Sequence, residues 1–172
     1  MNFEKKFEVF WQFFHDNGGY TVVLEGLRNT LIIAVLGLII GIIIGTLIAT
    51  ARVVPKTNPL VKILDWIARL YVSFFRGTPI VVQLLLFYYV LMPLLSINLK
   101  SVPVAVVVFG LNSGAYISEI MRAGILSVDS GQMEGGRSVG LSFGTTMIKI
   151  IIPQAVKNIL PTLGNEFISL IK

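Results

Sequence analysis

The feature that most constrains this chain is a long, uninterrupted apolar run. From Leu31 to Ala51 the sequence contains no charged residue. A helix of about 20 apolar residues is long enough to cross the hydrocarbon core of a bilayer, which is about 30 Å thick. The run is too long and too far from the N-terminus for a signal peptide, and Arg52 follows it instead of an alanine-rich cleavage site. We therefore predict a retained transmembrane helix.

Further apolar stretches predict further spans. Of the 172 residues, 55% are hydrophobic and 13% are charged, and a soluble domain does not produce uninterrupted apolar runs of this length. We predict an all-α, polytopic membrane protein with an interfacial N-terminal helix and four spans. The spans run from about Thr30 to Ala51, from Gly77 to about Leu95, from Val102 to about Ala123 and from Ile150 to Ile171.

The first 20 residues form a separate element. Their aromatic side chains recur at helical spacing, which indicates one apolar face: Phe3, Phe7, Phe10, Trp11 and Phe14. Such a helix suits the membrane interface, and the alternative is packing on a partner subunit. We expect residues 1–20 to be this amphipathic helix, ended by Asn17, Gly18 and Gly19, and residues 21–172 to be the transmembrane domain.

Small residues and charges predict how the spans are packed and oriented. Gly37, Gly41, Gly45 and Ala49 share one face of the first span, and we favour close packing of another helix there over a moving interface. Positive charges gather on one side of the spans: Arg52, Lys56, Lys62, Arg69, Arg76, Arg122, Arg137 and Lys149. The other side has only Lys5, Lys6, Arg28 and Lys100. The positive-inside rule therefore puts the N-terminus outside and residues 127–149 in the cytoplasm.

The remaining composition narrows the function classes. The net charge is +5, but the basic residues form no dense patch, so we expect no nucleic-acid binding. The absence of cysteine excludes thiolate metal sites and disulfides. His15 has no ligand partners nearby in the sequence, and we expect no metal and no cofactor.

A polar, glycine-broken island, Glu134 to Gly140, separates the last two apolar stretches. Ser127 or Ser130 can cap a short helix over 132–139, and Gly140 can end it in a left-handed turn. Ser142 can cap the next helix, which Pro153 interrupts. A helix held between two spans is suited to transmitting force, and the alternative is an ordinary solvated loop.

The island also carries a motif. The pattern is Glu-Ala-Ala-x-x-x-Gly, followed after nine residues by Ile-x-Leu-Pro. In this chain the first part is Glu134-Gly135-Gly136 with Gly140, and the second part, nine residues later, is 150-Ile-Ile-Ile-Pro-153. In this motif the chain resembles the permease subunits of ATP-binding-cassette (ABC) importers. The differences are Gly135 and Gly136 for the alanines and Ile152 for leucine; each glycine costs a helix roughly 1 kcal/mol relative to alanine, so we expect a looser helix.

Other blocks resemble the polar amino acid branch of these permeases, in the same order along the chain. They are Phe75 to Pro79 with 82-Val-Gln-Leu-84, then Gly114 to Arg122, then Asn165 to Ile168. Members usually have a fifth span, so we expect this chain to be short at its C-terminal end.

The resemblance implies a type I importer fold and a division of labour. A second, identical or related permease completes the pathway, an external binding protein delivers the solute, and a dimer of ABC ATPase subunits docks on the loop helix, residues 131–140. It implies a multi-pass protein of the bacterial cytoplasmic membrane. No phosphate-binding loop is present, so we expect no catalytic residues and no enzymatic activity in this chain. The expected coupling residues are Glu134, Gly135, Gly136, Arg137 and Gly140.

Polar residues inside the apolar stretches are the candidates for solute contact. Glu166 is the strongest, because a carboxylate in a membrane helix costs several kcal/mol unless it is paired or faces a cavity. Pro153 and Pro161 interrupt the same helix and free backbone carbonyls. The alternative for Glu166 is a structural pair with a basic residue. Weaker candidates, each of which can simply bond a neighbouring helix, are Asn165, Gln83, Thr78 and Asn112.

The predicted function is therefore translocation of a polar amino acid, with Glu166 attracting a cationic group of the solute. The alternative is a scaffold or channel-like membrane protein whose island binds another cytoplasmic protein. A membrane-embedded enzyme is a third class, but no span carries a His/Glu metal pattern, a Ser/Lys pair or paired aspartates. Glu119 and Arg122, three residues apart, are expected to pair with each other.

Overall fold

The computed structural model describes residues 3–16 and 18–171, and within them all regular secondary structure is helical. The predicted all-α class is confirmed. In chain order the elements are α1 (Phe3–Trp11), the π-helical turn η1 (Gln12–Asp16), α2 (Gly19–Val53), α3 (Pro59–Gly77), α4 (Ile80–Leu86), the π-helical turn η2 (Phe87–Leu91), α5 (Met92–Leu94), α6 (Ser101–Leu126), α7 (Ser130–Ser138), α8 (Phe143–Thr146), the π-helical turn η3 (Met147–Ile151) and α9 (Ile152–Ile171).

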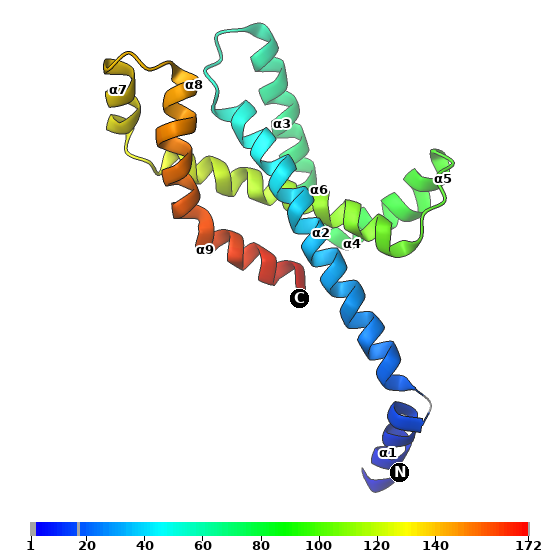
Figure 1. The fold of residues 1–172 in the computed structure, drawn as a ribbon. Helices are drawn as coiled ribbons and strands as arrows, with labels where there is room; N and C mark the ends of the chain where they lie inside the picture. Colours follow the sequence, from blue (N-terminus) through cyan, green and yellow to red (C-terminus); the bar gives the residue numbers. More distant parts are fainter. Residues whose placement is uncertain (1–2, 17, 172) are drawn as a thin grey trace.

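The crossing of α2 and α6 organises the molecule (Figure 1). Glycines of α2 lie directly against α6: a Cβ added to Gly41 would lie 2.7 Å from Ser113 Oγ, and one added to Gly45 would lie 2.7 Å from Ile117 Cγ2. In return, a Cβ on Gly110 of α6 would lie 2.6 Å from Ile40 Cγ2. Small residues thus let the two backbones approach closely, so another helix does pack on the glycine stripe.

A sharp bend separates α3 from α4. Asn58 caps α3 by accepting a hydrogen bond from the backbone N–H of Leu60, and Pro59 fills the first turn. The axis then turns by 107° between α3 and the α4–α5 segment. Pro79 is the N-cap residue of α4 and so lies directly before its first turn.

The number of spans differs from the prediction. Among the described residues, α2 and α6 are long and apolar enough to cross a membrane, and a third span results if the bent pair α3 and α4–α5 counts as one. The predicted total of four is not confirmed. Helix α2 also begins at Gly19, well before the predicted start at Thr30, because helical geometry continues through polar residues at which an apolar stretch ends.

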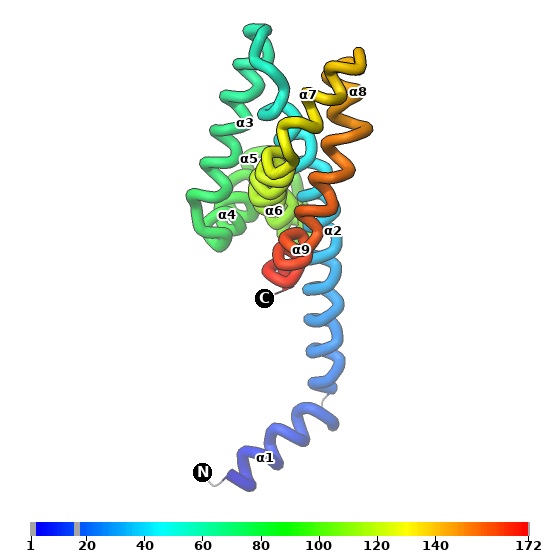
Figure 2. Tube along the Cα trace, turned by 90° about the vertical axis from the view of Figure 1, so that its left-hand side faces the viewer, coloured from blue at the N-terminus to red at the C-terminus, as the bar shows by residue number. Residues whose placement is uncertain are grey.

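The last helical stretch is less broken than predicted. Ser142 caps α8 as expected, accepting from the backbone N–H of Thr145 at 3.1 Å. Pro153 lies in the first turn of α9, and the π-helical turn η3 precedes it, so the helical course runs on from α8 into α9. Pro161 lies inside α9 without ending it. The segment α8–η3–α9 is therefore continuous from residue 143 to residue 171, and its axis changes direction along α9 (Figures 1 and 2).

The N-terminal element is helical, as predicted. Phe7 stacks on Trp11 at 6.2 Å and Phe10 on Phe14 at 5.7 Å, and the side chains of Phe7, Phe10 and Trp11 are exposed. Gly18 adopts a left-handed backbone conformation with φ of 70° before α2 begins, and Asn17 lies outside the described residues. Helix α1 lies at the end of α2 opposite to α7 (Figures 1 and 2).

Candidate functional site

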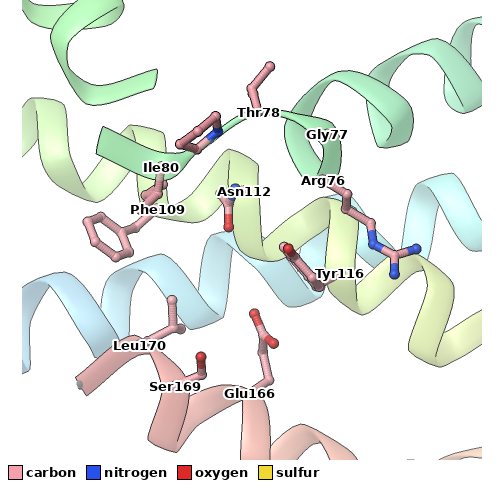
Figure 3. Close-up of a pocket in the computed structure, with 11 residues that line it drawn as sticks. Arg76, Gly77, Thr78, Ile80, Phe109, Asn112, Tyr116, Glu166, Ser169 and Leu170 are labelled. Atoms are coloured by element: carbon pink, nitrogen blue, oxygen red, sulfur yellow. The ribbon is translucent and has the colours of Figure 1, made fainter. Parts of the chain in front are cut away.

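A cavity of about 510 Å³ lies between the α3–α4 bend, α6 and α9 (Figure 3). Each of these elements contributes side chains to its wall. Glu166, Ser169 and Leu170 come from α9, and Phe109, Asn112 and Tyr116 come from α6. The bend adds a run of five residues, Arg76 to Ile80. The wall is therefore partly apolar, and it also includes a carboxylate, an amide and a guanidinium group.

Glu166 faces this cavity from α9. Its carboxylate is half-buried and accepts a hydrogen bond from Ser113 Oγ at 3.2 Å. None of the ion pairs formed by residues 3–16 and 18–171 includes Glu166. The alternative expectation, a structural pair with a basic residue, is therefore not met within this part of the chain.

Of the other predicted contact residues, some line the cavity and some do not. Thr78 and Asn112 line the cavity together with Glu166. Gln83 is buried, with 1% of its surface exposed, and does not line the cavity. Its side-chain amide donates hydrogen bonds to backbone carbonyls of the bend. Asn165 is exposed on α9 and is not part of the wall. The fold thus brings three of the five candidates together.

Arg76 and Tyr116 are cavity residues that sequence reasoning missed. The guanidinium carbon of Arg76 lies 5.1 Å from the centre of the Tyr116 ring, in cation–π geometry. In the sequence Arg76 counted as one of the positive charges that set the orientation and as part of the Phe75 to Pro79 block, and not as a candidate for solute contact. Its position directly before Gly77, Thr78 and Pro79 is the signal that could have placed it at the bend.

The island forms the predicted short helix, α7, with a different cap. Asp129 Oδ1 accepts from the backbone N–H of Gly131 at 2.7 Å, so neither Ser127 nor Ser130 is the N-cap residue. Gly140 ends the helix in the left-handed region with φ of 86°, as predicted. The N–H of Leu141 bonds the carbonyl of Gly136 and that of Gly140 bonds the carbonyl of Arg137, which is the Schellman arrangement.

The two glycines of the motif have different surroundings. A Cβ at Gly135 would meet nothing within 4 Å, whereas Gly136 is buried directly against the side chain of Thr146. At Gly136 the missing Cβ is therefore what lets α7 pack on α8. The expected loosening from glycine stays a prediction for Gly135, whereas Gly136 packs directly against Thr146. Glu134 and Arg137 are exposed, and Arg137 donates to the carbonyl of Leu141 at 2.8 Å.

Apolar contacts tie α7 to the ends of the long helices. Met133 packs on the buried cluster of Ile125, Ile151 and Ala155, which comes from α6, η3 and α9.

An ionic cluster joins α2 and α6. Glu119 of α6 accepts from Arg52 of α2 and from Arg122, the latter at 3.0 Å. The expected Glu119–Arg122 pair is confirmed, and Arg52 extends it across two helices.

Comparison with known proteins identifies the family. The family model described as "Binding-protein-dependent transport system inner membrane component" matches residues 37–172. The chain belongs to this family. The resemblance inferred from the island motif is confirmed, and with it the reading of the chain as a membrane protein.

Relatives within this family are named as amino acid permeases. The chain is 42% identical to the L-cystine transport system permease protein TcyB of Bacillus subtilis, over 89% of this chain and 63% of TcyB. It is 43% identical to the arginine transport system permease protein ArtQ of the same organism, over 87% of this chain and 66% of ArtQ. The chain thus spans somewhat less than two thirds of the length of these relatives.

A solved structure agrees with the sequence comparison. The structure described as an amino acid ABC transporter with histidines superposes with a TM-score of 0.77 at 39% identity, and the match covers 91% of this chain and 71% of that one. The predicted type I importer permease fold is confirmed by this likeness.

Proposed function

We propose that this chain is the permease subunit of an ABC importer that carries a polar amino acid across the bacterial cytoplasmic membrane. In this proposal the N-terminus lies outside, helix α1 with η1 rests in the outer interface, and the loop 127–149 lies in the cytoplasm. A second permease subunit completes the pathway, and an external solute-binding protein delivers the solute. ATP is hydrolysed by separate ATPase subunits docked on α7.

The observation that carries the proposal is the Glu166 carboxylate in the wall of the cavity. A carboxylate in a membrane segment is costly unless a positive group or a polar cavity compensates it. Ser113 supplies only a neutral hydrogen bond to Glu166. The ammonium group of an amino acid would supply the missing positive charge.

Arg76 supports the same assignment, because it supplies a positive charge for the α-carboxylate of an amino acid. It belongs to the same cavity wall as Glu166 (Figure 3). A guanidinium group matches a carboxylate in geometry and charge, so Arg76 is suited to the α-carboxylate while Glu166 takes the α-ammonium group. Ile80, Phe109 and Leu170 then surround the solute side chain.

The test is uptake of labelled amino acids by the reconstituted importer. A panel of amino acids identifies the solute, and Glu166→Gln is then compared with the parent protein. We expect at least a tenfold loss of solute-stimulated uptake with unchanged subunit assembly, because a buried charge pair is worth more than 1.4 kcal/mol. Glu25→Gln, which neutralises a carboxylate on α2 outside the cavity, is the matched control. Undiminished uptake by Glu166→Gln would contradict the proposal.

A further inference from the structure

The α3–α4 bend leaves backbone carbonyls that side-chain amides must satisfy. Pro79 has no backbone N–H, so the carbonyl of Phe75, four residues earlier, loses its usual helical donor. Gln83 Nε2 donates to this carbonyl at 2.9 Å and to the carbonyl of Thr78 at 3.0 Å. Because carbonyls can only accept, the nitrogen of Gln83 has to face the bend and its oxygen has to face away from it.

The orientation of Gln83 fixes the orientation of Asn112. Asn112 Nδ2 lies 3.0 Å from the carbonyl oxygen of Phe75 and 3.2 Å from Gln83 Oε1. Both partners are acceptors, so both N–H groups of Asn112 are used and its Oδ1 atom has to point the other way. Figure 3 shows this oxygen directed into the cavity, towards the side from which Glu166 comes.

The oxygen of Asn112 is open to a ligand. Within the described residues no donor bonds Asn112 Oδ1, and no buried side-chain nitrogen or oxygen there lacks a partner. The atom is therefore accessible from the cavity. Together with the Glu166 carboxylate it gives the wall two acceptor groups, which suit a ligand group that carries several N–H donors and a positive charge.

We propose that Gln83 is a positioning residue for solute selection: it holds Asn112 with its oxygen towards the cavity, so that Asn112 and Glu166 together receive the α-ammonium group of the amino acid. This inference rests on the proposed function. Gln83 does not line the cavity, so its effect on the solute passes through Asn112. If Asn112 turned over, its N–H groups would face the ammonium group and repel it.

The experiment measures equilibrium binding to the permease–ATPase complex in nanodiscs, without the binding protein. The probes are labelled L-arginine, L-cystine and L-glutamine, and N-acetyl-L-arginine and N-acetyl-L-glutamine, which have no α-ammonium group. Gln83→Met removes the amide at similar volume. We expect the affinity for the free amino acid to fall roughly three- to tenfold, the value of one hydrogen bond, and the weak affinity for the acetylated probe to stay the same.

Tyr71→Phe is the matched structural control. Tyr71 of α3 donates to the carbonyl of Leu111 on α6, so this variant also removes a hydrogen bond that α6 accepts or donates at this level, here between α3 and α6, but leaves the amides in place. Its affinity should equal that of the parent complex. An equal loss in Tyr71→Phe and Gln83→Met would overturn the positioning role, as would parental affinity in Gln83→Met.

Asn112→Asp tests the orientation independently of Gln83. Aspartate presents an oxygen to the cavity whichever way it turns, but it cannot donate to the carbonyl of Phe75 or to Gln83 Oε1. The measured quantity is therefore the ratio of the affinities for the free and the acetylated amino acid, because the loss of those two bonds affects both probes alike. The proposal expects a ratio at least as high as in the parent, and a recovered ratio in the Gln83→Met background. A lower ratio in Asn112→Asp would mean that the amide nitrogen faces the solute, and would overturn the proposal. If the parent complex binds none of the probes, the proposed function fails as well. If Glu166→Gln weakens binding and Gln83→Met does not, only the positioning role fails.

Discussion

At the scale of single residues, the two glycines of α7 make a sharp prediction. Gly135→Ala adds a methyl group in open space, so it should stabilise α7 by up to about 1 kcal/mol through helix propensity. Gly136→Ala adds the same group against Thr146 and should destabilise the contact between α7 and α8. Hydrogen exchange of the α7 amides should therefore slow in the first variant and quicken in the second.

The double variant Gly136→Ala with Thr146→Ser controls for this contact. Serine lacks the Thr146 methyl group that an added Cβ would meet, so part of the protection should return. Equal changes in exchange for Gly135→Ala and Gly136→Ala would contradict the different surroundings of the two glycines.

Single residues were predictable where their chemistry contrasts with the surrounding sequence. Glu166 is a carboxylate within an apolar stretch, and the structure indeed directs it to a cavity. Arg76 was missed because a basic residue near the end of an apolar run usually marks the membrane surface. The cap of α7 was assigned to a serine because sequence alone does not fix a helix start to within one or two residues.

At the scale of elements, the α2–α6 crossing should tolerate no large side chain. Gly41→Leu would force a side chain into Ser113 and the backbone of Gly114, whose nitrogen would lie 3.2 Å from a Cβ. We expect a loss of about 1 to 3 kcal/mol, the usual cost of overpacking, seen as a lower thermal unfolding temperature in detergent. Gly26→Leu, on the same helix with nothing within 4 Å of its Cβ, should leave that temperature nearly unchanged. Similar temperatures for both variants would contradict close packing at the crossing.

Elements were predicted well where an apolar run and a helix coincide. Helices α2 and α6 contain the predicted spans from Thr30 and from Val102, because their apolar stretches are long and unbroken. The 107° bend was not predicted, since hydropathy measures the length of an apolar stretch and not its direction. The amides of Gln83 and Asn112 stabilise that bend through contacts that are remote in sequence.

At the scale of the whole molecule, the same helices wall the cavity and hold α7. Helix α6 carries Asn112 and leads through Asp129 into α7, and α9 carries Glu166 and follows α8 and η3 (Figures 1 and 2). Met133 packs α7 against the buried cluster that α6, η3 and α9 share, and Gly136 packs it against Thr146 of α8. A displacement of α7 by a docked partner would therefore act on both walls of the cavity.

If α7 is the docking site of the ATPase, charge reversal or strain there should weaken the complex. Glu134→Lys reverses an exposed charge on α7, and Gly140→Arg puts a bulky side chain at a φ of 86° that favours glycine. We expect each variant to reduce by severalfold the ATPase that co-purifies with the tagged permease. Glu8→Lys makes the same charge change on α1, at the opposite end of α2, and should co-purify the parental amount. Parental amounts of ATPase with both α7 variants would count against coupling through α7 and would favour a scaffold or channel-like role.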